Sequence, residues 1–158
     1  MGTHHLALVG ATIYVDATEE PVHDSVVLMD QGKITAVGPR SQVERPRDTR
    51  VLDCTGCTVA AGFWNSHVHL AERKWSDAAN IPASELSQQL EDMFSRFGFT
   101  TAFDLSSSWE NTRTLRDRVD SGEVRGPRIY STGLALLPAN PRLPSALWHS
   151  AGFPPSGA

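Results

Sequence analysis

The sequence is poor in cysteine and in positive charge, and each shortage excludes a class of protein. Cys54 and Cys57 are the only cysteines among 158 residues, far below the density of a secreted domain held together by disulfides. A reducing compartment fits this content, and we expect a cytoplasmic protein. The 14 Lys and Arg residues are scattered and stand against 18 Asp and Glu, for a net charge of -4. We therefore expect no nucleic-acid partner, because a phosphate backbone needs a basic stripe.

Long apolar runs are also absent. The N-terminal MGTHHLALVGATIYVD lacks the cationic start and the long apolar stretch of a signal peptide. No segment approaches the roughly 18 apolar residues of a membrane span, so we expect no membrane partner. What is present is the composition of a globular protein, 40% hydrophobic and 20% charged, with enough chain for one sizeable core or two small ones.

The first 60 residues predict a small β-domain. Short segments rich in Val, Ile and Leu predict strands at 6–9, 11–15, 25–29, 34–37, 51–53 and 58–60. The link Asp30-Gln31-Gly32-Lys33 contains a glycine that can take positive φ, so the two strands around it predict a hairpin. Gly56 predicts a tight turn between the last two strands.

From Gly62 onward the pattern changes to strands that alternate with helices, which predicts βαβ units and a parallel sheet. We expect strands at 59–70, 100–105 and 128–133, with helices at 84–97 and 111–121. Ser84 is the expected N-cap of the first helix, and Gly98 lies where its C-cap would fall. Residues 134–158 hold five prolines and predict a loop.

The stretch GFWNSHVHL contains His67 and His69 at a spacing of two. Side chains at i and i+2 of a strand project from the same face, so both imidazoles could bind one cation at about 2.0–2.1 Å. Histidines held by ordinary hydrogen bonds can have the same spacing, so the pattern alone leaves both interpretations open. Its position favours the first, because α/β folds place their sites at the C-terminal ends of parallel strands.

Three segments carry a resemblance to a known family: VLDCTGCTVAAGFWNSHVHL, GFTTAFDL and LRDRVDSGEVRGPRIYSTG. Their order resembles the opening of metal-dependent amidohydrolases of the imidazolonepropionase-like type, along nearly all of residues 6–133. The resemblance implies an α/β fold, with a partial β-sandwich domain at 1–60. At 61–158 it implies the first three βα units of an incomplete (β/α)8 TIM barrel. One departure is Ala61, where the family usually has proline before the glycine.

The resemblance also implies the chemistry. His67 and His69 would bind a divalent metal, usually zinc, in a site of one or two ions. A small-molecule substrate would then be hydrolysed at a C–N bond, amide or cyclic amide-like, by a metal-activated water. A catalytic zinc generally needs three protein ligands and a water. In the family the other ligands and the general base come from later barrel strands, so the catalytic residues of this chain stay unassigned.

Length limits how much of a barrel this chain can form. A closed barrel takes roughly 250 residues and a βα unit about 30, so about three units fit after residue 60. We therefore expect the N-terminal part of a longer enzyme, a split gene product or one piece of a complex. Three strands leave an apolar sheet face open, which association with the missing C-terminal barrel half or with a second copy would cover. The alternative is a non-catalytic module with weak metal affinity.

Cys54 and Cys57 have the CxxC spacing of a redox pair or of half a zinc site. Their place in a turn between short strands favours a structural role instead. Asp104 could face the site or anchor a neighbouring loop or arginine through a charge-assisted hydrogen bond.

The remaining histidines receive no role. His149 could line a substrate pocket, but a solvated loop histidine is the favoured interpretation. His4 and His5 lie near the N-terminus, where chain ends are often frayed.

Overall fold

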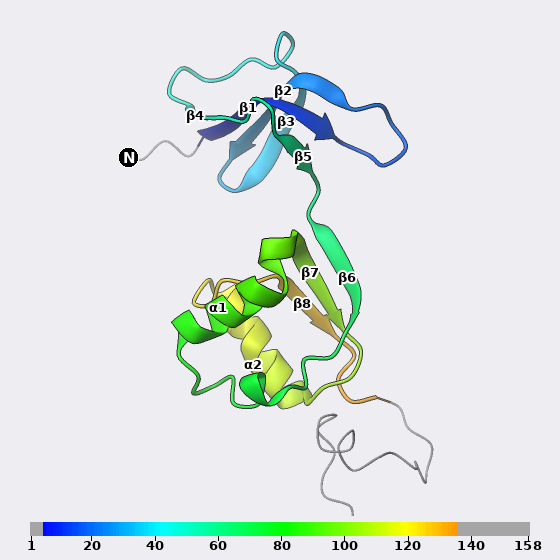
Figure 1. Ribbon diagram of the computed structural model, residues 1–158. Coiled ribbons are helices and arrows are strands. Elements are labelled where there is room, and N and C mark those ends of the chain that lie inside the picture. The colour runs from blue at the N-terminus through cyan, green and yellow to red at the C-terminus, as the bar shows by residue number, and fades with distance from the viewer. Residues whose placement is uncertain (1–4, 136–158) are drawn as a thin grey trace, which may run out of the picture. The chain divides into compact units, whose positions relative to one another are not determined.

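The computed structural model describes residues 5–135, and the chain divides into two compact units, Met1–Ala61 and Gly62–Ala158 (Figure 1). The first unit contains a five-stranded sheet, and the second contains a three-stranded sheet with helices. The protein is therefore a mixed α/β protein. No helix within residues 5–135 has both the length and the apolar character that a membrane span requires.

The first unit is one mixed sheet. Its strands are β1 (His5–Tyr14), β2 (Val22–Asp30), β3 (Lys33–Pro39), β4 (Arg50–Asp53) and β5 (Thr58–Ala60). The order is β3-β2-β1-β4, and β5 pairs with the C-terminal end of β1. β2 is antiparallel to both neighbours, whereas β4 and β5 run parallel to β1. The described residues of this unit provide one layer, so a second layer of a sandwich stays a prediction.

A glycine bulge joins two segments that the sequence predicted as separate strands. Gly10 has φ +87°, and β1 carries one extra residue opposite β2 at this point. A bulge changes which face each following side chain occupies. Accordingly, Ala7 and Val9 pack in one apolar cluster, whereas Ala11 and Ile13 pack in another. The expectation of a break at this glycine was wrong, because pairing with β2 continues through it.

The predicted turns of this unit are confirmed. Between β2 and β3, Gln31 and Gly32 have φ of 48° and 76°, the positive values that a type I′ hairpin requires at both central positions. Between β4 and β5, Gly56 has φ 79°. The N–H of Cys57 donates to the carbonyl of Cys54 at 2.9 Å and closes this second turn.

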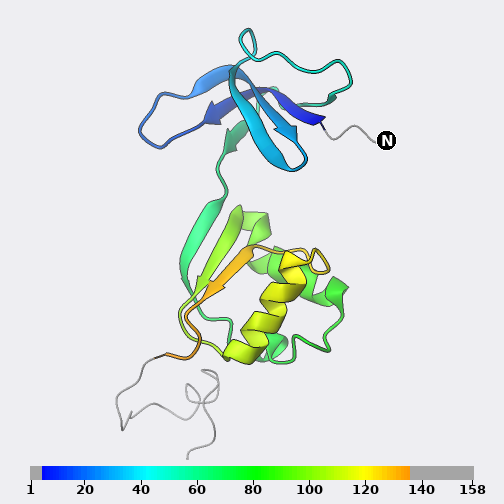
Figure 2. The same ribbon diagram turned by 180° about the vertical axis from the view of Figure 1, so that it is seen from behind.

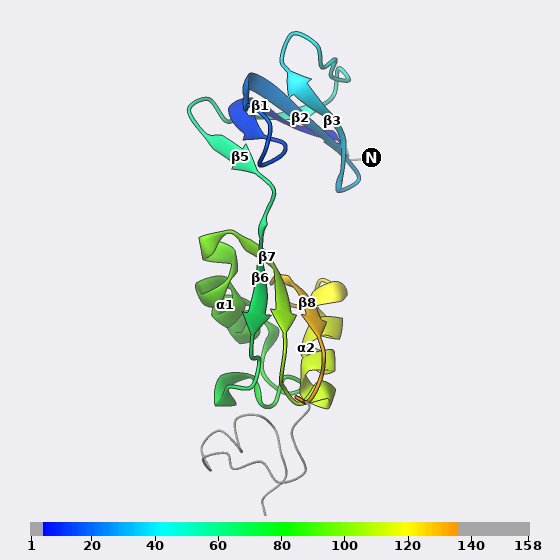
Figure 3. The same ribbon diagram turned by 90° about the vertical axis from the view of Figure 1, so that its right-hand side faces the viewer.

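The second unit alternates strands and helices. Its elements are β6 (Phe63–Val68), η1 (Arg73–Trp75), α1 (Ala83–Met93), η2 (Ser95–Phe97), β7 (Phe99–Asp104), α2 (Trp109–Asp120) and β8 (Arg128–Ser131). The strands are parallel in the order β6-β7-β8, as predicted. Figures 1 and 2 show both α-helices on one side of this sheet. In Figure 3 the strands face the viewer and the helices lie behind them.

The two faces of this sheet carry different side chains. Ala102 and Ile129 pack with the helices in one buried core. Their neighbours Phe103 and Tyr130 take the opposite face, where the ring of Tyr130 stacks on Phe103 and on Trp64. Trp64 is 60% exposed and Tyr130 is 39% exposed, so this open face is aromatic. The remaining core residues are Leu70, Trp75, Ala78, Leu86, Leu90, Phe94, Leu115 and Val124.

The ends of α1 differ in part from the prediction. The helix begins at Ala83, and Pro82 occupies the N-cap position with extended backbone angles. The carbonyl of Pro82 accepts the N–H groups of Glu85 and Leu86. Ser84 lies inside the helix and is not the N-cap, so that prediction was wrong. At the other end the chain continues through η2 and stops at Gly98, whose left-handed φ of 81° confirms the predicted C-terminal signal.

Candidate metal site

The two histidines lie at the C-terminal end of β6. His67 is within the strand and His69 follows its last residue, Val68. Both histidines are exposed, whereas Val68 is partly buried and packs against the core on the helix side. The pairing of β6 with β7 is irregular between Asn65 and Val68, and beyond this point the alternation around Val68 directs the two imidazoles toward the open face of the sheet. Their ring centroids are 5.2 Å apart, and the ring planes are nearly perpendicular at 85°.

This ring separation fits a shared metal ion. A zinc–nitrogen distance of about 2.0–2.1 Å, extended by a ring radius of about 1.15 Å, puts each centroid about 3.2 Å from the ion. Two such ligands at a tetrahedral angle would have centroids about 5.2 Å apart. The observed 5.2 Å between the centroids of His67 and His69 agrees with that value, and it also lies within the 4.5–7 Å of ordinary edge-to-face ring pairs. Imidazole is also a common donor for zinc and related divalent ions.

The pair makes up only part of a ligand set within the described chain. Among residues 5–135, no group of three or more His, Cys, Asp or Glu side chains could hold a metal ion. A catalytic zinc usually has three protein ligands and an open position. His67 and His69 can therefore supply two donors, and further donors would have to come from outside the described residues.

Asp104, the last residue of β7, anchors the loop that follows the histidines. Its side chain is fully buried. Oδ1 accepts a hydrogen bond from the Leu70 N–H at 2.9 Å. Oδ2 accepts hydrogen bonds from the hydroxyls of Ser107 and Ser131, each at 2.6 Å. Of the two alternatives that the sequence left open for Asp104, these contacts show the loop anchor.

The two serine partners of Asp104 were not found by sequence reasoning. Ser107 belongs to the run of three serines after β7, and Ser131 ends β8. The signal that could have found them is small hydroxyl residues at the ends of neighbouring parallel strands. Such residues can donate hydrogen bonds to a carboxylate buried at the same edge of the sheet.

The cysteine pair lies in the turn that the sequence predicted. Cys54 is nearly buried in an apolar cluster of the first unit, and Cys57 is exposed; both are free thiols. The CxxC motif leads into β5 and opens no helix, unlike a thioredoxin-type pair. Asp53 stabilises the same turn, because its carboxylate accepts a hydrogen bond from the Thr55 N–H at 2.9 Å. Hydrogen bonds from the side chain and N–H of Thr55 also lower the pKa of Asp53 below its usual range. This arrangement supports a structural role for the motif.

The other described histidines, His5 and His23, lie in the first unit. His5 lies in β1, and its Nδ1 is 3.4 Å from a carboxylate oxygen of Asp30. His23, in β2, is exposed and contacts the Thr12 hydroxyl at 3.2 Å. His4 and His149 lie outside the described residues.

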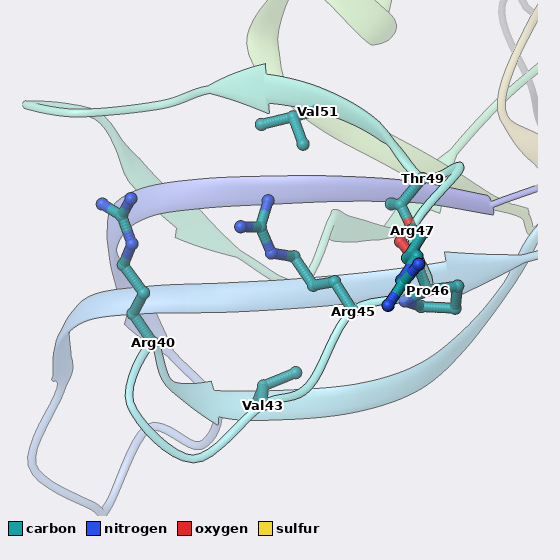
Figure 4. Close-up of a pocket in the computed structure, with 7 residues that line it drawn as sticks. All are labelled: Arg40, Val43, Arg45, Pro46, Arg47, Thr49 and Val51. Atoms are coloured by element: carbon teal, nitrogen blue, oxygen red, sulfur yellow. Dashed lines mark hydrogen bonds between the residues drawn. The ribbon is translucent and has the colours of Figure 1, made fainter.

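A hollow in the first unit is lined by a basic loop. Figure 4 shows the guanidinium groups of Arg40, Arg45 and Arg47 along this loop. All three arginines are exposed, and Arg40 also pairs with Asp24 at 3.8 Å. Solvent screens such charges and leaves each anion contact weak. The hollow is therefore a weaker candidate for a site than the histidine pair. Its other lining residues are Val43, Pro46, Thr49 and Val51.

The sequence is similar to those of dihydroorotases from Anaeromyxobacter. No family model matches the sequence. The chain is 33% identical over 113 residues to the dihydroorotase of Anaeromyxobacter dehalogenans strain 2CP-C. It is 31% identical over 113 residues to the dihydroorotase of Anaeromyxobacter sp. strain K. Each match covers 72% of this chain and 23% of the relative, so the chain spans under a quarter of their length.

Solved structures give a consistent result. The fold is similar to that of molinate hydrolase, with a TM-score of 0.67 and 27% identity over 85% of this chain and 31% of that one. It is also similar to a prolidase complexed with N-methylphosphonate-L-proline, with a TM-score of 0.65 and 26% identity over 94% of this chain and 40% of that one. Together these likenesses indicate the amidohydrolase superfamily, and the chain covers only part of each relative.

Proposed function

We propose that His67 and His69 are two metal ligands of a metal-dependent amidohydrolase that hydrolyses C–N bonds, amide or cyclic amide-like, in small molecules. The observation that carries the proposal is the shared face and the 5.2 Å ring separation of the two imidazoles at the end of β6. The similar proteins support the reaction class, since they include dihydroorotases, a prolidase and molinate hydrolase.

We further propose that β6, β7 and β8 are the first strands of a (β/α)8 TIM barrel and that the first unit is part of a β-sandwich. The parallel strand order and the helices on one face support the barrel. The exposed aromatic face supports it too, because a barrel buries that face. Either further barrel strands or a second copy of the chain would cover this face.

The residues of this chain would hold and orient the ion. His67 and His69 would each donate a ring nitrogen, and the packing of Val68 into the core keeps both rings on the open face. Imidazole donors suit zinc as well as copper, iron and nickel, and we propose zinc, in a site of one or two ions. When bound, the ion would polarise a substrate carbonyl and activate a water for attack on the C–N carbon. A cytoplasmic location stays a prediction from the low cysteine content.

Zinc titration of histidine variants tests the proposal. His67→Ala and His69→Ala should each weaken zinc binding by about tenfold or more, because each removes one of the two described donors. His23→Ala is the matched control, since this exposed histidine lies in β2 of the first unit. Calorimetric titration of all four proteins measures the affinities. Equal zinc affinity in the intact chain and in His67→Ala would contradict the proposal.

The second candidate function is a non-catalytic module with weak metal affinity. It is supported by the absence of a third donor near the pair among residues 5–135. Hydrolysis assays with zinc, using Xaa-Pro dipeptides and dihydroorotate as probes, separate the two candidates. Zinc-dependent turnover that disappears in His67→Ala supports the hydrolase. Zinc binding without turnover of any probe supports the non-catalytic module for this chain alone.

A further inference from the structure

Both peptide groups that flank His69 are held by one short segment at the end of β7. In the peptide before His69, the Val68 carbonyl accepts a hydrogen bond from the Leu105 N–H at 3.0 Å. In the peptide after it, the Leu70 N–H donates to Asp104 Oδ1 at 2.9 Å. Because these two peptides define φ and ψ of His69, residues 104 and 105 set the direction in which its side chain leaves the backbone.

The Asp104 carboxylate is itself firmly held. Its second oxygen accepts the hydroxyls of Ser107 and Ser131, each at 2.6 Å. The Ser107 hydroxyl also contacts the Thr112 hydroxyl of α2 at 2.5 Å. The backbone carbonyl of Asp104 accepts the Thr132 N–H at 3.0 Å. The fully buried carboxylate therefore joins the C-terminal ends of β6, β7 and β8 and the start of α2.

We infer that Asp104 is a positioning residue for His69, a role that rests on the proposed metal site. Asp104 is not a metal ligand in this arrangement, because its buried oxygens accept hydrogen bonds from Leu70 and the two serines. It acts on His69 through the Leu70 amide instead. Partners that orient a metal ligand without touching the metal typically change affinity by about 10–100-fold when they are removed.

A purely structural role for Asp104 gives a different expectation. A carboxylate that only joins strand ends would, when removed, lower the melting temperature and leave the zinc affinity of the folded protein unchanged. The zinc affinity and the ring signals of the histidines in the folded state therefore distinguish positioning from general stabilisation.

Two substitutions of Asp104 and one control give the test. Asp104→Ala removes every hydrogen bond of the side chain. Asp104→Asn keeps an oxygen that can accept the hydrogen bond from the Leu70 N–H. Its NH2 group can donate hydrogen bonds to the oxygens of the serine hydroxyls. Thr112→Val is the control, because it removes one hydrogen bond of the same network and leaves the Leu70 contact in place. Each folded chain is titrated with zinc, and its metal-free form is studied by NMR.

We expect Asp104→Ala to weaken zinc binding by about tenfold or more. It should also speed hydrogen exchange of the Leu70 amide and broaden or shift the His69 ring signals. Asp104→Asn should recover most of the affinity, and Thr112→Val should stay within about twofold of the intact chain. Unchanged zinc affinity and unchanged His69 signals in folded Asp104→Ala would overturn the inference.

A second variant keeps the test decisive if Asp104→Ala does not fold. Ser107→Ala combined with Ser131→Ala removes both hydroxyls that fix Oδ2 of Asp104, so the carboxylate can move and its hydrogen bond with the Leu70 N–H should weaken. We expect a smaller loss of zinc affinity, about threefold, with faster exchange at Leu70. If the freed carboxylate changes neither the exchange nor the affinity, the positioning role is wrong.

Failure of the metal site would look different from failure of positioning. If the intact chain binds zinc no better than a variant that lacks both histidines, the proposed function is wrong. NMR of the metal-free chain would still show whether Asp104→Ala releases the His69 ring, and a released ring would keep the positioning role. If zinc binds through both histidines but Asp104→Ala leaves the His69 ring and the affinity unchanged, only the positioning role is wrong.

Discussion

The two units of the chain bury their apolar side chains in different ways. The first unit has two small clusters around one sheet, and it depends on tight turns and a glycine bulge. The second unit has one larger core between its parallel sheet and its helices, and the other face of that sheet remains aromatic and exposed. The histidine pair occupies the sheet that has only one covered face. The chemistry of the pair therefore depends on what covers the open face and supplies the other ligands.

The largest difference between the units should appear on truncating their cores. Leu90 of α1 is fully buried in the single core of the second unit. Leu90→Ala should lower the free energy of unfolding by about 2–5 kcal/mol. Val26→Ala, in one of the small clusters of the first unit, should cost about 2 kcal/mol. Urea unfolding of both variants measures the two losses, and a larger loss from Val26→Ala would contradict this comparison.

A partly buried arginine, Arg118, contributes to the second unit beyond its core. Nη1 of Arg118 donates to the carbonyls of Ala78 at 2.5 Å and Ile81 at 2.7 Å, and the side chain is 14% exposed. Arg118→Ala should cost about 1–3 kcal/mol, because it leaves these carbonyls without a donor. Arg116→Ala is the control; Arg116 pairs with the adjacent Asp117, and such surface pairs contribute about 0–1 kcal/mol. Equal losses of stability in Arg118→Ala and Arg116→Ala, measured by thermal unfolding, would contradict the contribution of the hydrogen bonds from Arg118 to the two carbonyls.

The glycine bulge tests the first unit. Gly10 has φ +87°, and an added Cβ would lie 2.6 Å from Oγ1 of Thr55. Gly10→Ala should cost about 1–2 kcal/mol from its backbone angle alone, and the close contact should add to this. Gly32→Ala is the matched control, because Gly32 has φ +76° but no atom within 4 Å of its Cβ position. A melting temperature equally low in both variants would show that the contact with Thr55 has no effect.

The open aromatic face should affect association more than stability. The rings of Trp64 and Tyr130 stack at 5.8 Å. Trp64→Ser with Tyr130→Ser should cost only about 1 kcal/mol and should reduce self-association in sedimentation velocity experiments. Tyr14→Ser is the control, since this exposed tyrosine belongs to the first unit. Undiminished association after the double substitution would mean that the aromatic face is not the contact surface.

The smallest effect concerns pH. The hydrogen bond from Arg118 lowers the pKa of Glu123 below its usual range. The interaction of Arg118 with ionised Glu123 therefore stabilises the folded chain above the ordinary glutamate pKa. This stabilisation is lost as the pH falls through the lowered pKa. The melting temperatures of the intact chain and of Glu123→Gln should differ slightly near pH 7 and converge near pH 2. A difference that grows on acidification would contradict the sign of this shift.

Local patterns were sufficient to predict most strands and the direction of the histidines. The i, i+2 spacing of His67 and His69 determines their common face once the segment is extended. The hairpin at Gly32 was predictable for the same reason, because turn chemistry is local. The bulge at Gly10 was not predictable, since a glycine can either end a strand or form a bulge within it. Pairing with β2, which is distant in the sequence, decides between the two.

The surroundings of the pair could not be predicted from local patterns. Asp104 is 34 residues from Leu70 and 27 residues from Ser131 along the chain. Their contacts arise only after three strands align in parallel, which no short window of sequence contains. The start of α1 shows the same limit on a smaller scale, because the helix begins at Ala83 with Pro82, not Ser84, in the N-cap position.

X-ray absorption spectroscopy of the zinc-loaded chain tests the central claim most directly. We predict a nitrogen shell at about 2.0–2.1 Å with the scattering pattern of two imidazoles. This pattern should be absent when His67→Ala and His69→Ala are combined. A sulfur shell at about 2.3 Å would instead assign the zinc to Cys54 and Cys57. A sulfur shell, or an oxygen-only shell, would contradict the claim that the histidine pair holds the metal.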